Sequence, residues 1–193
     1  SNNLNVAEDG IFISGLTMKD EIETIINYSE KNNLTKFAII APENIYGNAV
    51  IKLLESATLN KDITIFSKIL FESENPDFYE VAKQVSDYEN RSKNLLEKIE
   101  SLKQDNSEKA KKEIKLLQQK DTYGELQFDS LYIAVENFQQ LSLLSSTLPY
   151  YDVDPKKIQY FGTSLWNKEA IIKEPGLNNS IFVSLLCLMS FGW

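Results

Sequence analysis

The chain has 193 residues, 42% apolar and 25% charged, which suits one globular domain with a sizeable core. Its net charge of −8 disfavours a nucleic-acid surface, because phosphate binding needs clustered Lys and Arg. Cys187 is the single cysteine and there is no histidine, which excludes His-dependent catalysis, an internal disulfide and a cysteine metal cluster. Any catalysis would therefore have to rest on carboxylates, Lys or Tyr, and we expect no cofactor and no metal.

The N-terminal stretch shows no basic segment followed by an apolar one, so we expect any signal peptide to lie upstream. Ile11 to Ser14 reads as a short strand. Thr17 followed by Asp20 and Glu21 predicts a capped helix start, and the helix should run to about Asn32.

A buried strand, a short loop and a helix follow between residues 36 and 57. The continuous apolar run from Phe37 to Ala41 is typical of a strand covered on both faces, and Pro42 should end it. Asn44 is the expected cap of the next helix. Its apolar positions repeat at helical spacing, at Ile45, Ala49, Val50, Leu53, Leu54 and Ala57.

A third strand is predicted from Ile63 to Leu70. Asn75 and Pro76 indicate the cap and first residue of a long helix. Its heptad-spaced positions are Phe78, Val81, Val85, Tyr88, Ser92, Leu95, Ile99 and Leu102. After a break at residues 104–106, Ser107 should cap a second helix, giving a helical hairpin insert at about 86–120. We favour a solvated outer face over a partner site for its charged residues.

In the rest of the chain, predicted strands again alternate with helices. We expect strands at Phe128–Val135, Ile158–Gly162 and Ser180–Ser184, with a helix from Phe138 to Leu148. Such alternation predicts an α/β fold with a mainly parallel sheet flanked by helices. We assign residues 1–184 to one lobe and residues 185–193 to an apolar tail, which is shorter than the roughly 20 residues of a membrane span.

Three stretches carry a resemblance to a known family. They are FISGLTMKDEI (12–22), FAIIAPENIYGNAVIKLL (37–54) and FDSLYIAVENFQQLSLLSSTLPYYDVDPKKIQYFGTSLWN (128–167). Together they resemble the type I periplasmic binding proteins. The patterns YYDVDP, FGTSLWN and EPGL, with the charged insert, are similar to the penicillin-binding protein activator branch, which is related to amino-acid-binding subunits of ABC transporters.

The resemblance implies two α/β lobes with a ligand cleft between them, of which this sequence matches the second lobe. It implies a non-enzymatic periplasmic lipoprotein that docks a penicillin-binding protein and regulates peptidoglycan synthesis. The alternatives are a leucine-binding-like subunit for an amino acid or small solute, and a truncated, inactive fragment. An unpaired cleft and the apolar tail would also favour self-association.

Ligand-binding candidates follow the predicted strand ends, because open parallel sheets bind ligands beyond the carboxyl ends of their strands. Asn44 and Tyr46 follow the second strand, and the alternative is that Asn44 only caps its helix and Tyr46 is half-buried. Ser14 and Thr17 follow the first strand, and for Thr17 a capping role is favoured.

The remaining candidates follow the last long strands. Glu136 follows the fourth strand and could instead favour a helix N-terminus as a first-turn acid. Thr163, Ser164 and Trp166 follow the fifth, and the Trp166 ring would stack on a ligand or, as we favour, plug the lobe. Amino-acid-binding relatives hold the ligand ammonium with an acid near this point. Residues 162–164 offer no carboxylate, which disfavours the hypothesis that the protein binds an amino acid.

Overall fold

The computed structural model describes residues 16–135 and 137–184 of the chain. Five strands form one sheet in the order β2-β1-β3-β4-β5, and every neighbouring pair is parallel. The predicted α/β fold with a parallel sheet is therefore confirmed. The strands are β1 (Lys36–Pro42), β2 (Thr64–Phe71), β3 (Ser130–Ile133), β4 (Gln159–Gly162) and β5 (Ile181–Phe182).

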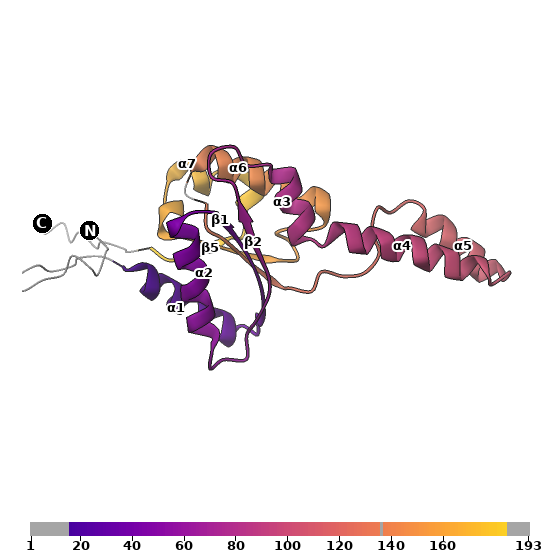
Figure 1. Ribbon diagram of the computed structural model, residues 1–193, viewed down its shortest axis with the longest axis horizontal. Helices are drawn as coiled ribbons and strands as arrows, with labels where there is room; N and C mark the ends of the chain where they lie inside the picture. Colours follow the sequence, from indigo (N-terminus) through magenta and orange to yellow (C-terminus); the bar gives the residue numbers. More distant parts are fainter. Residues whose placement is uncertain (1–15, 136, 185–193) are drawn as a thin grey trace, which may run out of the picture.

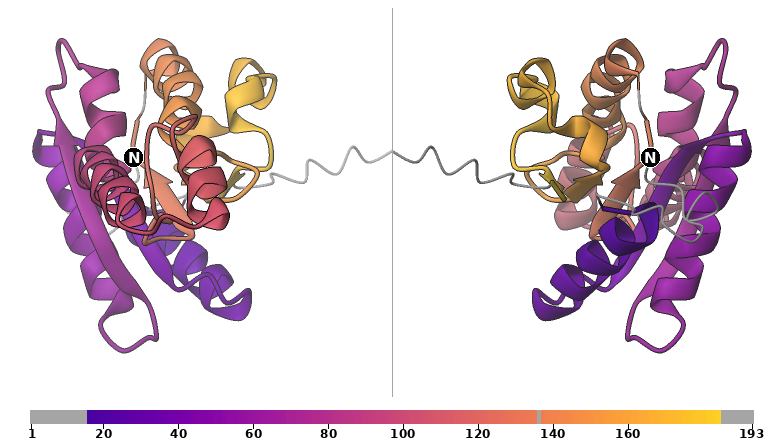
Figure 2. Two further views of the ribbon diagram at one scale, coloured as in Figure 1. Left: turned by 90° about the vertical axis from the view of Figure 1, so that its right-hand side faces the viewer. Right: turned by 90° about the vertical axis from the view of Figure 1, so that its left-hand side faces the viewer.

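Helices cover both faces of this sheet (Figure 2). One face packs against α1 and α2, and the other against α3 and α6, so the sheet separates two apolar cores. The α-helices are α1 (Met18–Lys31), α2 (Ile45–Thr58), α3 (Phe78–Val85), α4 (Tyr88–Lys103), α5 (Glu108–Leu117), α6 (Phe138–Thr147) and α7 (Glu169–Ile172). Short 3-10 turns cover Leu148–Tyr151, Ser164–Trp166 and Pro175–Leu177.

β1 lies between β2 and β3, with apolar side chains on both of its faces. Phe37 and Ile39 point into the core under α1 and α2, whereas Ala38 and Ile40 point into the core under α3 and α6. A strand in this position is shielded from water on both faces, which explains its continuous apolar run rather than an alternating one. Pro42 is the last residue of the strand, as expected.

The start of the predicted long helix is different in the structure. Asn75 and Pro76 precede the helix, and Asp77 is its N-cap, accepting hydrogen bonds from the backbone N–H groups of Tyr79 and Glu80. The prediction that Asn75 caps the helix was wrong, because an aspartate two residues later offers the same acceptor chemistry.

In α2, Ile45 was also placed wrongly on the buried face: it is 92% exposed beside the cap.

The predicted long helix is in fact two helices. It breaks between α3 and α4 at Ser86 and Asp87, where Asp87 adopts a left-handed backbone conformation with φ of 53°. The heptad pattern continues through the break, because Phe78, Val81 and Val85 bury against the lobe while Leu95 packs within the hairpin. Apolar spacing alone does not distinguish one long helix from two helices with a break between them.

α4 and α5 lie side by side and project from the lobe (Figure 1). Ser107 caps α5 through a hydrogen bond from the backbone N–H of Ala110, as predicted. Lys98 of α4 pairs with Glu113 of α5 at 3.6 Å. The hairpin leaves the lobe at the amino ends of the strands, because α3 runs back from the carboxyl end of β2.

Several expectations lie outside the described residues. They are the strand Ile11–Ser14, the tail at residues 185–193 with Cys187, and the candidate residues Ser14 and Glu136. Across residues 16–135 and 137–184, no helix is long and apolar enough to cross a membrane.

Candidate functional site

The carboxyl ends of the five strands share one edge of the sheet, and polar residues gather there. At the β1 end, Asn44 caps α2 by accepting a hydrogen bond from the Gly47 N–H at 2.9 Å. The Asn44 amide also donates to Ser73 Oγ at 3.2 Å, in the loop that follows β2. Gln140 of α6 donates to the Ser73 carbonyl at 3.1 Å. These bonds connect three strand ends into one polar corner, which the sequence indicated only through Asn44.

Gly47 is required beside this corner because α2 approaches the end of β1 closely. A Cβ atom at position 47 would come within 1.9 Å of the Pro42 carbonyl oxygen. The Asn44 cap is therefore held at a short, fixed distance from the strand end, and both observations agree with the structural role that the sequence left open for Asn44.

A second polar group lies between α1 and the end of β4. Glu21 is only 6% exposed, and its carboxylate accepts a hydrogen bond from the Ser164 N–H at 3.1 Å. Burial raises the pKa of Tyr132, and the neighbouring Tyr46 and Glu21 raise it further, so the Tyr132 phenol stays protonated. The structure thus brings Ser164 to Glu21, and Tyr46 and Glu21 both act on Tyr132; sequence reasoning had treated Glu21 only as a first-turn acid.

The sequence contained a signal for Glu21. It precedes Ile25 and Ser29 by four and eight residues, and both of these are fully buried on α1. A carboxylate at such spacing lies on the buried face of the helix, where it needs a hydrogen-bond donor.

The side-chain hydroxyl of Thr163, directly after β4, lacks a hydrogen-bond partner in the described structure. Thr163 is 5% exposed, and its Oγ1 is a buried side-chain atom. Buried hydroxyl groups are normally paired, and because this one is shielded as well as unpaired, a molecule at the carboxyl edge would reach it only after a local rearrangement.

Thr17 and Trp166 have structural roles in the described chain. Thr17 forms a capping box with Asp20, in which the Asp20 N–H donates to Thr17 Oγ1 at 3.2 Å and the Thr17 N–H donates to Asp20 at 3.0 Å. Hydrogen bonds from Thr17 hold the pKa of Asp20 below its ordinary value. The Trp166 ring is fully buried against Gly162, and its N–H donates to the Val135 carbonyl at 3.3 Å. We leave Trp166 out of the proposed ligand surface.

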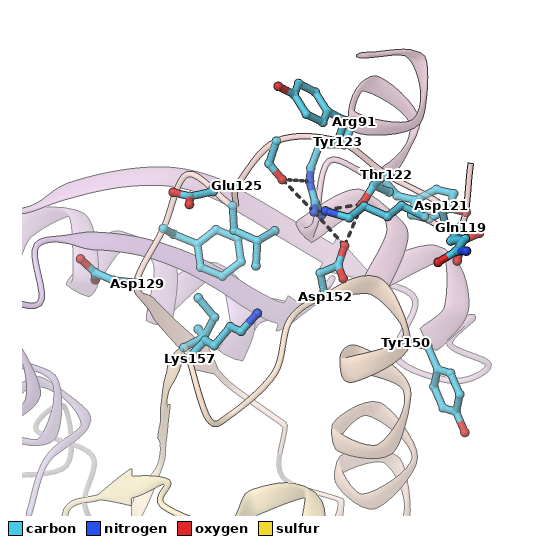
Figure 3. Close-up of a pocket in the computed structure, with 16 residues that line it drawn as sticks. Arg91, Gln119, Asp121, Thr122, Tyr123, Glu125, Asp129, Tyr150, Asp152 and Lys157 are labelled. Atoms are coloured by element: carbon cyan, nitrogen blue, oxygen red, sulfur yellow. Dashed lines mark hydrogen bonds and ion pairs between the residues drawn. The ribbon is translucent and has the colours of Figure 1, made fainter. Parts of the chain in front are cut away.

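A larger hollow, of about 880 Å³, lies at the opposite edge of the sheet (Figure 3). It is formed by the base of the hairpin, the extended segment 119–129 and residues 150–158. Arg91 closes one side: it is 7% exposed and donates to the Gly124 carbonyl, Thr122 Oγ1 and the Asp152 carboxylate at 2.7–3.2 Å. The sequence did not predict this hollow, because its walls come from three distant segments.

Asp152 lies in the YYDVDP stretch and connects it to the hairpin. Its burial opposes ionisation, but hydrogen bonds from Thr122 and Arg91 outweigh that effect and hold the pKa of Asp152 below its ordinary value. The neighbouring Val153 carbonyl accepts the hydroxyl of Tyr160 in β4 at 2.5 Å. Among the described residues, no cluster of three or more His, Cys, Asp or Glu side chains could hold a metal ion.

Comparison with known proteins gives the class of fold. No family model and no curated protein matches the chain in sequence. A substrate-binding periplasmic protein from Ralstonia solanacearum matches with a TM-score of 0.55 and 10% identity, over 90% of this chain and 37% of that one. An ABC transporter solute-binding protein from Rhodopseudomonas palustris in complex with 4-hydroxybenzoate matches with a TM-score of 0.54 and 8% identity, over 80% and 32%.

Another solute-binding protein from R. palustris, in complex with 3,4-dihydroxybenzoic acid, matches with a TM-score of 0.50 and 15% identity, over 81% of this chain and 34% of that one. These structural neighbours are type I periplasmic binding proteins, and the chain has the fold of one of their lobes. It spans about a third of the length of the proteins it matches.

Proposed function

We propose that this chain is a non-enzymatic, small-ligand-binding domain of a periplasmic solute-binding type, and that the carboxyl edge of its sheet forms one wall of the ligand site. The proposal rests on the polar residues that gather at that edge, where the buried Oγ1 of Thr163 has no hydrogen-bond partner in the described structure and would meet a ligand after a small local rearrangement exposes it. Asn44, Tyr46 and Ser164 lie at the same edge and would complete this wall. The fold shared with ligand-binding periplasmic proteins supports the assignment.

The chemistry of this edge favours a ligand with carboxylate or hydroxyl oxygens over an amino acid. Residues 162–164 offer no carboxylate for an ammonium group, the nearby Glu21 carboxylate is buried and already accepts the Ser164 N–H, and the Thr163 hydroxyl can both donate to and accept from an oxygen. The N-termini of α1, α2 and α6 also lie at this edge, and their dipoles favour negative charge. Two of the structural neighbours hold hydroxybenzoate-type acids, which have this chemistry.

Heteronuclear NMR of the chain, titrated with 4-hydroxybenzoate and separately with leucine, tests the proposal. We expect 4-hydroxybenzoate to shift the amide resonances of Thr163, Ser164 and Gly47, and leucine to shift them less. Thr163→Val should abolish those shifts. Thr58→Val, a buried threonine at the far end of α2, is the matched control and should keep them. Unchanged binding by Thr163→Val would contradict the assignment.

A regulatory role is the second candidate. We infer it from the YYDVDP, FGTSLWN and EPGL stretches, which resemble the penicillin-binding protein activators, and from the position of Asp152, where one of these stretches anchors the hairpin. The chain would then act in the periplasm and dock a penicillin-binding protein. Biolayer interferometry with a purified bifunctional penicillin-binding protein tests it, and absence of binding would count against this role without affecting the ligand site.

A further inference from the structure

The hairpin carries a charge opposite to that of the rest of the molecule. Residues 88–120 contain nine basic and six acidic side chains, a net charge of +3, whereas the whole chain carries −8. The remaining residues therefore carry −11. The positive charge stands apart from the lobe, because α4 and α5 project away from it (Figure 1).

The unpaired part of this charge lies on and just beyond α5. Within residues 88–120, Lys93, Lys98, Lys103 and Lys111 each have a carboxylate within 4 Å, and Arg91 pairs with Asp152. The cations of the hairpin for which the structure records no such partner are Lys109, Lys112, Lys115 and Lys120.

Three of these lysines surround an exposed apolar side chain. Lys112 lies three residues from Lys109 and Lys115 and four residues from Leu116, so the four side chains share the outer face of α5. Leu116 is 63% exposed, while Ala110 and Leu117 on the opposite face are buried. We call Lys109, Lys112, Lys115 and Leu116 the α5 outer face.

We propose that the α5 outer face is a docking surface for an acidic protein, which presents carboxylates to the lysines and an apolar notch to Leu116. An apolar centre within a charged rim is the usual anatomy of a protein interface. The 16 residues of α4 extend about 24 Å, about three times the Debye length at physiological salt. Glu113 of α5 pairs with Lys98, ten residues into α4, so the α5 outer face lies partway along this length, where salt screens part of the repulsion from the acidic lobe. This inference does not rest on the ligand proposed for the carboxyl edge.

Two other partners for the α5 outer face are a lipid surface and a second copy of this chain. A lipid surface is disfavoured because an interfacial helix needs a broad apolar face, and the apolar face of α5 already packs on α4. A second copy of this chain also presents an acidic lobe, and the oligomeric state of the chain alone distinguishes it from another acidic protein.

The test uses a fluorescent oligo-glutamate peptide with one central leucine, followed by fluorescence anisotropy at about 20 mM and about 200 mM NaCl. We expect binding at low salt that weakens at least about tenfold at high salt. Lys112→Glu/Lys115→Glu should reduce affinity by about tenfold or more. Lys31→Glu/Lys52→Glu makes the same charge change on exposed positions of the lobe and should reduce affinity less than about threefold.

A second matched pair tests the apolar centre. Leu116→Ser should weaken binding by about fivefold or more, whereas Leu96→Ser, at an equally exposed leucine of α4, should not. Equal losses for the lysine pairs, or no binding by the wild type, would overturn the proposal. So would binding to phosphatidylglycerol vesicles but not to the peptide, or a salt-sensitive dimer of the chain alone that is lost in Lys112→Glu/Lys115→Glu.

Discussion

Arg91 is a buried cation whose hydrogen-bond partners come from segments far from it in sequence. Its guanidinium group contacts Thr122, Gly124 and Asp152, and its backbone carbonyl accepts the Tyr123 N–H at 3.0 Å. A planar guanidinium satisfies several acceptors at once, which lysine cannot do. One residue thus holds the hairpin, the extended segment and the loop before β4 together.

Removing this side chain should destabilise the protein strongly. Arg91→Ala leaves Thr122 and the Gly124 carbonyl without their donor, and we expect a loss of about 2–4 kcal/mol in the free energy of unfolding. Urea denaturation at neutral pH measures this. Lys98→Ala breaks the surface pair with Glu113 and should cost less than about 1 kcal/mol. Equal losses would contradict a special role for Arg91.

The depressed pKa of Asp152 predicts a pH dependence. Because the carboxylate is favoured in the folded state, its contribution to stability is complete above the ordinary pKa of 3.8 and is lost as the pH falls towards the lower folded-state pKa. Asp152→Asn should therefore be less stable at neutral pH and lose less stability than the wild type between about pH 5 and about pH 3. Urea unfolding across that range measures both, with the exposed Asp62→Asn as control.

At the scale of elements, the break between α3 and α4 directs the hairpin away from the lobe. Asp87 adopts its left-handed conformation there without a side-chain capping bond. Such a conformation costs an L-residue about 1–2 kcal/mol and glycine almost nothing.

Substitutions at Asp87 should therefore follow backbone preference. We expect Asp87→Gly to be about as stable as the wild type or up to about 1 kcal/mol more stable, and Asp87→Val to be about 1–2 kcal/mol less stable. Thermal unfolding followed by circular dichroism measures the order. A valine variant as stable as the wild type would mean that α3 and α4 can form one continuous helix.

The sequence predicted the elements whose signals are local and missed the features that depend on tertiary contacts. β1 and the Asn44 cap were predicted because their signals are local. The break at Asp87 was not, because the apolar spacing is the same on both sides of it. Arg91 was overlooked beside Ser92, which occupied the heptad position, and its partners lie 31 to 61 residues away.

The described residues form distinct features at the two ends of the strands. The carboxyl edge carries Thr163 and Asn44, and the amino edge carries the hairpin and the hollow at its base. Of the residues predicted to bind a ligand, Asn44, Tyr46, Thr163 and Ser164 follow described strands, and whether they bind a ligand stays a prediction. Self-association, expected from an unpaired cleft, also stays a prediction that light scattering can test.

Amide hydrogen exchange should show that the sheet of the lobe is more stable than the hairpin. The amides of β1 and β3 lie in fully buried strands and should exchange most slowly, whereas α4 and α5 bury few residues and should exchange faster. In Arg91→Ala, exchange should accelerate in the hairpin far more than in β1. Mass-spectrometric detection resolves the two regions, and a uniform acceleration would show that the hairpin and lobe open together.

The long sequence separation between Arg91 and Asp152 has a consequence during synthesis. A ribosome adds about 5–20 residues per second, so the 61 residues between them take about 3–12 s to appear. For that interval Arg91 exists without the carboxylate that fixes the hairpin to the lobe. A nascent chain stalled before Asp152 should therefore show a protease-sensitive hairpin, and one stalled well beyond it a protected one.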